Sequence, residues 1–323
     1  MALIFYIVYK SISFFAATVA CIIWIFFPSQ TIYNMFVLSE PLYTMIILCF
    51  IAFLIYVSPK LKKSSLKKTM LFSGILGVIL TIINSLRPLA PILIIALFIF
   101  LFLIHGHIKD KSDLLKKTFF FICTVFIYVI FGILSNQYMA SRLGQPVATL
   151  PAYNIYVGFN LETNGQYSQD DMNLLAAHAN NASAPEAQKA MMNAVINRIK
   201  NTNYNLTFFD NKINALLSNE NACVLYGGNA ISHPTLWSVI AVSFYNVILI
   251  YSFIGCIVAF IKREKSIVLF STLFLIGLTA AHMFVEVAAR YHYSIILSLT
   301  ILSAYVVDFL FHRKSTSNPK ASH

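Results

Sequence analysis

Charged residues are scarce in this chain. Only 11% of its 323 residues are Asp, Glu, Lys or Arg, whereas 59% are hydrophobic. Soluble globular chains are about 45–50% apolar and about 25% charged, so this composition excludes an ordinary soluble domain. It predicts an all-α polytopic membrane protein, because bilayer spans are helices of about 20 apolar residues.

Acidic residues are about half as frequent as basic ones, 12 against 23, and the net charge is +11. Nucleic-acid binding would account for such a charge, but the basic residues alternate between loops, as the positive-inside rule predicts for a membrane protein. The basic segments are 10, 60–68, 109–117, 262–265 and 313–320. This alternation predicts eight spans in the plasma membrane with both termini in the cytoplasm.

Metal-binding and redox motifs are also lacking. The five cysteines form no CxxC motif and no Cys/His cluster, so neither a disulfide framework nor a metal site is predicted. No cofactor is evident, and no ligand cluster supports a divalent metal. The spans carry almost no ionisable groups at mid-depth, which argues against an ion-coupled transporter.

The apolar runs place the eight spans and divide the chain into four parts. The spans are expected at about 3–27, 39–57, 69–86, 89–104, 118–135, 235–261, 267–289 and 291–311. Residues 1–135 would form a five-span bundle, 136–234 an external loop domain that is mostly helical, and 235–311 a three-span bundle. Residues 312–323 would form a disordered cytoplasmic tail.

The external region contains helix-start signals. Ser168 with Asp171 and Ser183 with Glu186 have the spacing of capping boxes, and Pro185 is tolerated in a first turn. A third helix is expected over 206–217, with an apolar face formed by Leu206, Phe209, Ile213, Leu216 and Leu217. Asn164-Gly165 is the strongest turn signal.

Polar residues gather where the spans meet the outer face. Each has a structural interpretation: Arg87 could extend to lipid phosphates, and Glu286 and Arg290 could form a helical ion pair at i,i+4. Tyr291 and His292 could belong to an interfacial aromatic belt. Asp170 and Asp171 could complement the dipole at the start of a helix. His282 could be a hydrogen-bonded histidine of the core. The set that shares this face is Glu40, Arg87, Asn160, Asn164, Asp170, Asp171, Glu286, Arg290, Tyr291 and His292.

Taken together, these residues also fit a site for an amphiphile with a phosphorylated head. Arginine binds phosphate through two parallel N–H donors. A nearby carboxylate could orient an arginine or a sugar hydroxyl, and the aromatic rings offer stacking surfaces.

Four segments in this order resemble one family: "SEPLY" opening a span, "RPLAP" between spans, "VGFNLETNGQYSQDD" after a span and "VEVAARYHY" before the last span. Together they resemble integral-membrane glycosyltransferases of the GT-C type, related to protein mannosyltransferases and lipid A aminoarabinose transferases. The resemblance covers most of residues 25–310. It implies transfer of a sugar from a polyprenyl-phosphate donor to an acceptor on the outer membrane face.

The resemblance also implies residue roles. Arg87 and Arg290 would contact the donor phosphate, with Glu40, Glu286, Tyr291 and His292 as supporting groups. Asn160 and Asn164 belong to a loop that would lie over the donor or acceptor groove.

One departure concerns the catalytic acids, which this family carries in its first external loop. Here that loop, "PSQTIYNMFVL", has no acid. We therefore expect a C-terminal portion of such an enzyme, completed by a missing N-terminal half or a partner chain. The catalytic residues stay unassigned, with Asp170 and Asp171 as the candidates. A polysaccharide polymerase or ligase and a non-catalytic degenerate membrane protein remain as alternatives.

Overall fold

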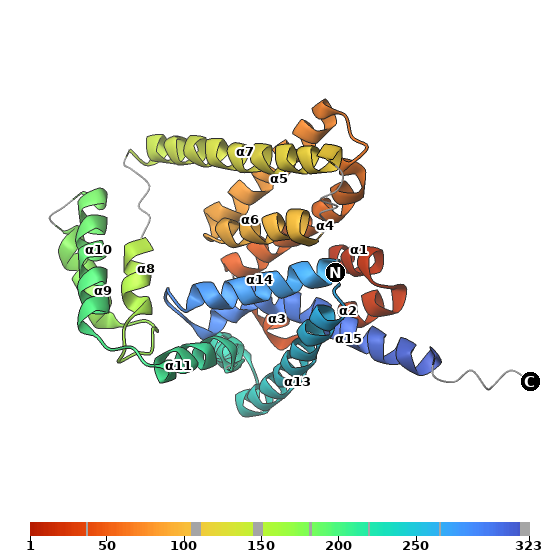
Figure 1. The fold of residues 1–323 in the computed structure, drawn as a ribbon. Helices are drawn as coiled ribbons and strands as arrows, with labels where there is room; N and C mark the ends of the chain where they lie inside the picture. Colours follow the sequence, from red (N-terminus) through yellow and green to blue (C-terminus); the bar gives the residue numbers. More distant parts are fainter. Residues whose placement is uncertain are drawn as a thin grey trace, which may run out of the picture.

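The computed structural model describes residues 1–36, 38–104, 111–144, 151–180, 183–218, 220–264 and 266–316, and these ranges contain helices and connections but no strand (Figure 1). The all-α prediction is confirmed for this part of the chain. The helices of the N-terminal half are α1 (Ala2–Ser11), α2 (Phe14–Phe26), α3 (Pro28–Tyr33), α4 (Ser39–Leu61), α5 (Leu66–Leu86), α6 (Ala90–Phe98), its π-helical continuation η1 (Ile99–Ile104), and α7 (Lys111–Leu143).

Shorter helices follow α7 and precede a second set of long ones. They are α8 (Pro151–Gly158), α9 (Gln169–Ala179), α10 (Ala184–Asn201), α11 (Leu206–Leu217), α12 (Asn221–Gly227) and the 3₁₀ turn η2 (Gly228–Ala230). The C-terminal elements are α13 (Pro234–Ile261), α14 (Ile267–His282), the 3₁₀ helix η3 (Ala289–Ile295) and α15 (Ile296–Thr316).

Within the described ranges, five helical segments are long and apolar enough to cross a membrane: α4, α5, α7, α13 and the continuous segment Ala289–His312. Eight spans are therefore not confirmed. The predicted spans 3–27, 89–104 and 267–289 correspond to shorter apolar helices, namely Ala2–Ser11, Phe14–Phe26, Ala90–Phe102 and Ile267–His282.

The predicted continuous span over 3–27 is divided at Ser13. The Ser13 hydroxyl oxygen accepts a hydrogen bond from the Ala16 amide at 3.0 Å, which makes Ser13 the N-cap of α2. The same hydroxyl donates to the Asp308 carboxylate on α15. A serine that satisfies a free helix N–H favours a new helix start, so an uninterrupted apolar run contains a break that hydropathy alone does not detect.

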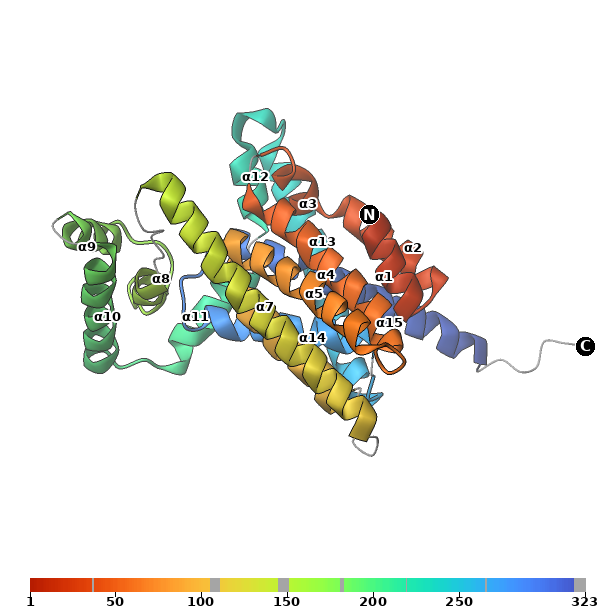
Figure 2. The same ribbon diagram turned by 90° about the horizontal axis from the view of Figure 1, so that it is seen from above.

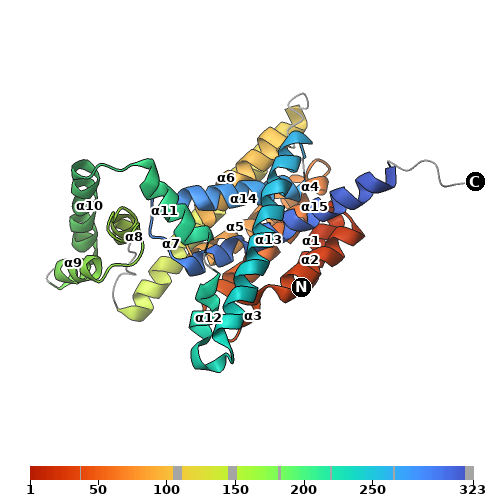
Figure 3. The same cartoon turned by 90° about the horizontal axis from the view of Figure 1, so that it is seen from below.

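The C-terminal segment forms the centre of the bundle and α7 its periphery. In Ala289–His312, 72% of the most apolar window is buried, against 11% in α7. Helix α15 packs against α13, α14 and α2, whereas α7 packs mainly on α5. Figures 2 and 3 show α7 on one outer side of the bundle and α13 on another. Because α7 exposes most of its apolar surface, it has the character of a helix that faces lipid.

Helices α8, α9 and α10 lie together beside one end of the bundle (Figures 1 and 2). The end where α8–α12 lie is the one that the charge pattern predicts to face outward, and it is called here the outer end. The predicted helix starts in this region are confirmed, since Ser168 caps α9 and Ser183 forms a capping box with Glu186 at the start of α10. Asn164 and Gly165 have φ angles of 51° and 75°, as the turn prediction requires.

Lys212 attaches this region to the bundle. Its side chain is fully buried, and Nζ donates to the carbonyl oxygens of Gly158 at 2.6 Å, Val285 at 2.9 Å and Met283 at 3.0 Å. An ammonium group has three N–H donors, so all of them are used. Burial lowers the pKa of Lys212 to about 8, and the group is mainly protonated at pH 7.

The predicted apolar face of α11 is therefore wrong at two of its positions. Leu206 is 88% and Ile213 is 37% exposed, whereas Phe208, Lys212 and Leu216 are buried. The physical reason is that three buried carbonyl oxygens lie beneath the helix and require hydrogen-bond donors, which a leucine side chain does not have. The helix is therefore oriented with Lys212 facing these carbonyl groups.

Replacement of Gly165 by alanine tests how tightly this attachment is packed. A Cβ atom at Gly165 would lie 2.8 Å from both the Gly158 oxygen and Lys212 Cε. Gly144 is a matched control, because its φ of 68° is similar and a Cβ there would have no described atom within 4 Å. Gly144→Ala should cost about 1 kcal/mol from its backbone angle alone, and Gly165→Ala clearly more.

The measurement is thermal unfolding of the full chain in detergent micelles. Equal shifts in Tm for the two variants would contradict the close packing of Lys212 against the Gly165 turn.

Candidate functional site

A cavity of about 420 Å³ lies at the outer end, between the end of α5, the start of α6, the end of α14 and η3. Much of its wall is apolar, with Leu86, Leu89, Ile92 and Leu278 among its lining residues. The polar lining residues are Arg87, Asn154, His282, Glu286, Tyr291 and Ser294. A mostly apolar cavity with a few convergent polar groups is the usual form of a ligand site.

The chain leaves the helix at Arg87 because Pro88 follows it. Residues before proline avoid helical backbone angles, and Arg87 has the extended angles φ −150° and ψ 143° directly after α5. A new helix starts at Ala90 with Pro91 in its first turn. The "RPLAP" segment thus turns the chain sharply and places the guanidinium group on the cavity wall.

Arg87 is held by a carboxylate and by two aromatic rings. It forms an ion pair with Glu40 of α4, whose side chain is only 3% exposed, while that of Arg87 is 18% exposed. The guanidinium carbon lies 4.6 Å from the ring centroid of Tyr291 and 5.3 Å from that of Tyr43. These contacts place Arg87 in a fixed position within the protein instead of extending toward lipid phosphates.

Glu286 reaches the same cavity from an extended connection between α14 and η3. Its backbone N–H donates to the Asn154 carbonyl at 2.8 Å, and the next N–H, of Val287, donates to the Gly165 carbonyl at 2.9 Å. Burial raises the pKa of Glu286, and the attraction of Arg290 and Arg87 offsets this effect only in part. The site therefore contains a half-buried carboxylate with increased proton affinity.

Glu286 and Arg290 do not form the predicted helical ion pair. Residues 286–288 are not helical and Arg290 belongs to the 3₁₀ helix η3, so the i,i+4 geometry of an α-helix does not exist here. No ion pair joins these two described residues. Instead, an Arg290 N–H donates to the Tyr226 hydroxyl at 2.9 Å, and the Arg290 guanidinium carbon lies 5.6 Å from the Tyr291 ring centroid. Arg290 does not line the cavity that contains Arg87.

Tyr291 lies near both arginines and contacts a histidine as well. Its ring stacks on His282 with centroids 5.4 Å apart and an interplanar angle of 22°. The Nδ1 atom of His282 lies 3.1 Å from the Glu286 carbonyl oxygen. The expectation of a hydrogen-bonded, buried His282 is confirmed, and His282 also forms part of the cavity wall.

His292 lies in the core, where it contacts a carboxylate that the sequence did not single out. His292 Nε2 forms a hydrogen bond with Glu220, and both side chains are 1% exposed or less. The second carboxylate oxygen of Glu220 accepts from the Ser29 amide at 3.2 Å. Glu220 therefore connects α3, α12 and η3. No local sequence motif identifies Glu220, because its partners lie 72 and 191 residues away along the chain.

The loop residues predicted near the groove have structural contacts. Asp171 is 3% exposed and forms a bidentate ion pair with Arg198, at 2.8 Å and 3.0 Å. The amide of Asn160 donates to Asp171 at 2.9 Å, and Asn164 accepts from Asn211 at 3.0 Å. Asp170 is exposed in the first turn of α9. None of these four lines the cavity, although their loop contributes Gly165 to its support.

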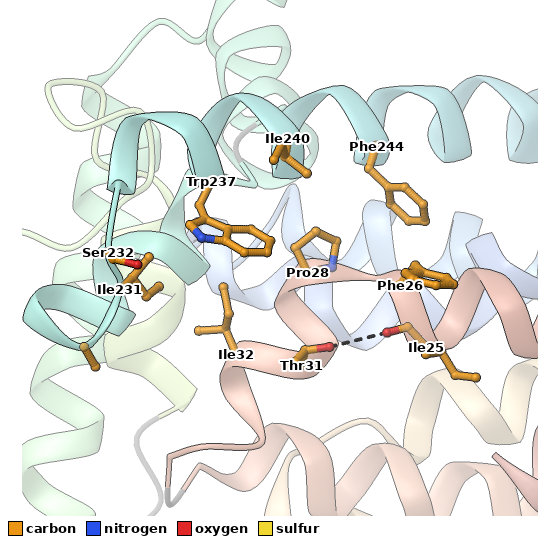
Figure 4. Close-up of a pocket in the computed structure, with 11 residues that line it drawn as sticks. Ile25, Phe26, Pro28, Thr31, Ile32, Ile231, Ser232, Trp237, Ile240 and Phe244 are labelled. Carbon is orange, nitrogen blue, oxygen red and sulfur yellow. Dashed lines mark hydrogen bonds between the residues drawn. The ribbon is translucent and has the colours of Figure 1, made fainter.

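A second, larger groove of about 520 Å³ lies between α2, α3 and α13 (Figure 4). Figure 4 shows Trp237, Ile240 and Phe244 of α13 facing Phe26, Pro28 and Ile32. Thr31 and Ser232 are the polar side chains apart from the indole N–H, and no charged residue lines it. This groove can hold hydrocarbon, but it offers no group for acid–base chemistry.

No group of three or more His, Cys, Asp or Glu side chains is placed to hold a metal ion within the described ranges. No protein-family model, curated protein or solved structure matches this chain. The function therefore has to be argued from the site itself.

Asp171→Asn and Asp170→Asn separate a structural acid from an exposed one. Asp171→Asn removes the charge that holds Arg198 and should destabilise the protein by about 2 kcal/mol, the scale of a hydrogen bond to a charged group. Asp170→Asn should change stability by less than about 0.5 kcal/mol. Chemical denaturation of both variants, followed by circular dichroism, checks this. Equal stabilities would show that the Asp171–Arg198 pair contributes nothing.

Proposed function

We propose that this chain is a membrane glycosyltransferase, or the C-terminal part of one. It would transfer a sugar from a polyprenyl-phosphate donor to a cell-envelope acceptor at the outer face of the membrane. The observation that carries the proposal is the cavity that Arg87 and Glu286 both line, together with apolar side chains. The order of the four segments that resemble GT-C enzymes adds support from the sequence.

Arg87 is suited to the donor phosphate. A guanidinium group has five N–H donors, and the contact with Glu40 fixes its orientation without using all of them. Its stacking on Tyr291 limits its motion further. A cation held in place before the reaction stabilises the charge that develops on a leaving phosphate.

Glu286 is suited to the role of general base. Between described residues it forms no ion pair, it faces the cavity, and burial raises the pKa of its carboxyl group. In the proposed reaction an acceptor hydroxyl oxygen attacks the anomeric carbon, and the bond between this carbon and the phosphate oxygen breaks. The hydroxyl proton passes to Glu286, and the polyprenyl phosphate leaves with its negative charge facing Arg87.

The apolar surfaces explain why the substrate would be an amphiphile. Leucine and isoleucine side chains adjoin Arg87 in the cavity, so a phosphate with a hydrocarbon chain fits better than a free sugar nucleotide. Arg290, whose guanidinium group lies near the Tyr291 ring, would act at the edge of the site. A polymerase or ligase that acts on lipid-linked glycans would use the same groups. It would differ from the proposed glycosyltransferase in the acceptor that receives the sugar.

Glu286→Gln is the sharpest test, with Glu162→Gln, at an exposed position of the Asn160–Gly165 turn, as its control. The assay uses purified full chain in nanodiscs with a radiolabelled polyprenyl-phosphate hexose, and measures donor binding and sugar release separately. Glu286→Gln should bind the donor within about twofold of the parent and lose at least about 100-fold in turnover, the usual contribution of a general base. Glu162→Gln should change neither.

Two results would contradict the proposal at different points. If the parent chain does not bind the donor, the proposed substrate class is wrong. If Glu286→Gln releases sugar at the parent rate, the donor site stands but Glu286 is not the base.

The pH dependence of turnover gives a second test. A base must be deprotonated, so activity should fall as the pH falls through the pKa of Glu286. Because burial raises that pKa, the acidic limb should lie at higher pH than the value of about 4.3 for an ordinary glutamate. Donor binding at each pH serves as the control. A limb at or below the ordinary value would refute the buried-base assignment.

A further inference from the structure

A third cavity, of about 380 Å³, lies at the opposite end of the bundle. Helices α4 and α14 connect the two ends. Helix α4 carries Glu40 in its first turn, and near its other end Ser58 and Pro59 line this cavity. Helix α14 begins at this cavity and ends at His282, which lines the outer cavity. The chain segments 60–68, 111–117 and 262–264 adjoin this end, so it is called here the basic end.

Polar and basic groups from four helices line this cavity. They are Lys10 and Ser11 of α1, Ser58 of α4, Asp113 and Lys117 of α7, and Ser266 at the start of α14. Lys117 Nζ contacts the Asp113 carboxylate at 2.6 Å, which neutralises the one acid in the lining. Lys10 has no carboxylate partner in the described part of the chain and supplies the excess positive charge.

The serine hydroxyl groups in this cavity can donate hydrogen bonds to a ligand. Serine side chains in helices commonly donate to a carbonyl one turn earlier, as Ser73 and Ser252 do here. Among the described residues, Ser11 and Ser58 make no such bond. Ser266 accepts from the Val268 amide at 3.3 Å and keeps its O–H for a ligand. The amino end of α14, which carries partial positive charge, faces the same space.

We propose that this cavity binds the phosphate of an anionic phospholipid from the surrounding leaflet. Lys10 would contact the phosphate by charge, and the three serine hydroxyls would donate hydrogen bonds to its oxygens. Charge complementarity identifies an anion, because basic pockets between membrane helices bind anionic headgroups. The apolar side chains of Ile55, Phe100 and Ile267 in the same lining favour a phosphate that carries acyl chains.

This site is independent of the proposed transferase site. Helix α14 supplies lining residues to both cavities, but the two cavities share no lining residue. Its test uses lipid binding, not sugar transfer, so the two proposals can fail separately.

The test titrates the full chain in neutral detergent with phosphatidylglycerol, phosphatidylcholine or inorganic phosphate. Bound lipid is counted by native mass spectrometry, and Tm is followed in parallel. Phosphatidylglycerol should bind and raise Tm, with much smaller effects from the other two probes. Lys10→Gln should weaken phosphatidylglycerol binding about fivefold, the effect of one lysine near a lipid headgroup. Ser58→Ala should weaken it by a smaller factor.

Lys67→Gln is the matched control, because it removes the same charge from the basic end at an exposed position outside the cavity. It should change binding by less than about twofold. If Lys10→Gln and Lys67→Gln weaken phosphatidylglycerol binding equally, the lipid is attracted by the overall positive charge of the basic end and not bound at this cavity. Equal binding of both lipids would overturn the headgroup assignment, and equal protection by inorganic phosphate would overturn the lipid assignment.

Discussion

The outer end of this protein depends on one buried ammonium group. Lys212 joins the Gly158 turn of the external helices to the Met283 and Val285 carbonyls, which belong to the connection after α14. That connection continues directly into Glu286, whose backbone pairs with Asn154. Removing Lys212 would leave three carbonyls without a donor, at about 1–3 kcal/mol for each one that stays buried and unpaired. The lysine therefore fixes both the external helices and the backbone that presents Glu286.

Buried carboxylates connect the elements around this attachment. Glu40 joins α4 to the turn after α5, Glu220 joins α3 and α12 to η3, and Asp171 joins α9 to α10. Such pairs add little net stability, since desolvation opposes their attraction, but breaking one leaves an uncompensated charge. Their effect is to specify one arrangement among the many that apolar helices could adopt. Hydrophobic packing alone would leave the rotation of these helices poorly defined.

Local features of the fold could be predicted from the sequence, and long-range pairings could not. The helix starts at Ser168 and Ser183, and the Asn164-Gly165 turn, depend on neighbouring residues, and all three occur as expected. The break at Ser13 depends partly on Asp308, which is 295 residues away. The inward rotation of Lys212 depends on carbonyls from two distant segments. For the candidate site, the sequence placed Glu40, Arg87, Glu286 and Tyr291 at one face, and the structure brings them together. The structure leaves Arg290 and His292 outside the cavity, because η3 directs successive side chains to different neighbours.

The same pairings distinguish Glu286 from the other acids at the outer end. Glu40, Asp171 and Glu220 are each in contact with a basic side chain, so their charges already serve the fold. Glu162, Asp170, Glu186 and Asp210 are exposed to solvent and line no part of the cavity. Glu286 is half-buried, faces a cavity and has only through-space attraction to Arg87 and Arg290. An ion pair stabilises the ionised form of a carboxylate and so lowers its affinity for a proton. By that criterion Glu286 is the acid at this end that is suited to chemistry, while the paired acids keep Arg87 and η3 in position around it.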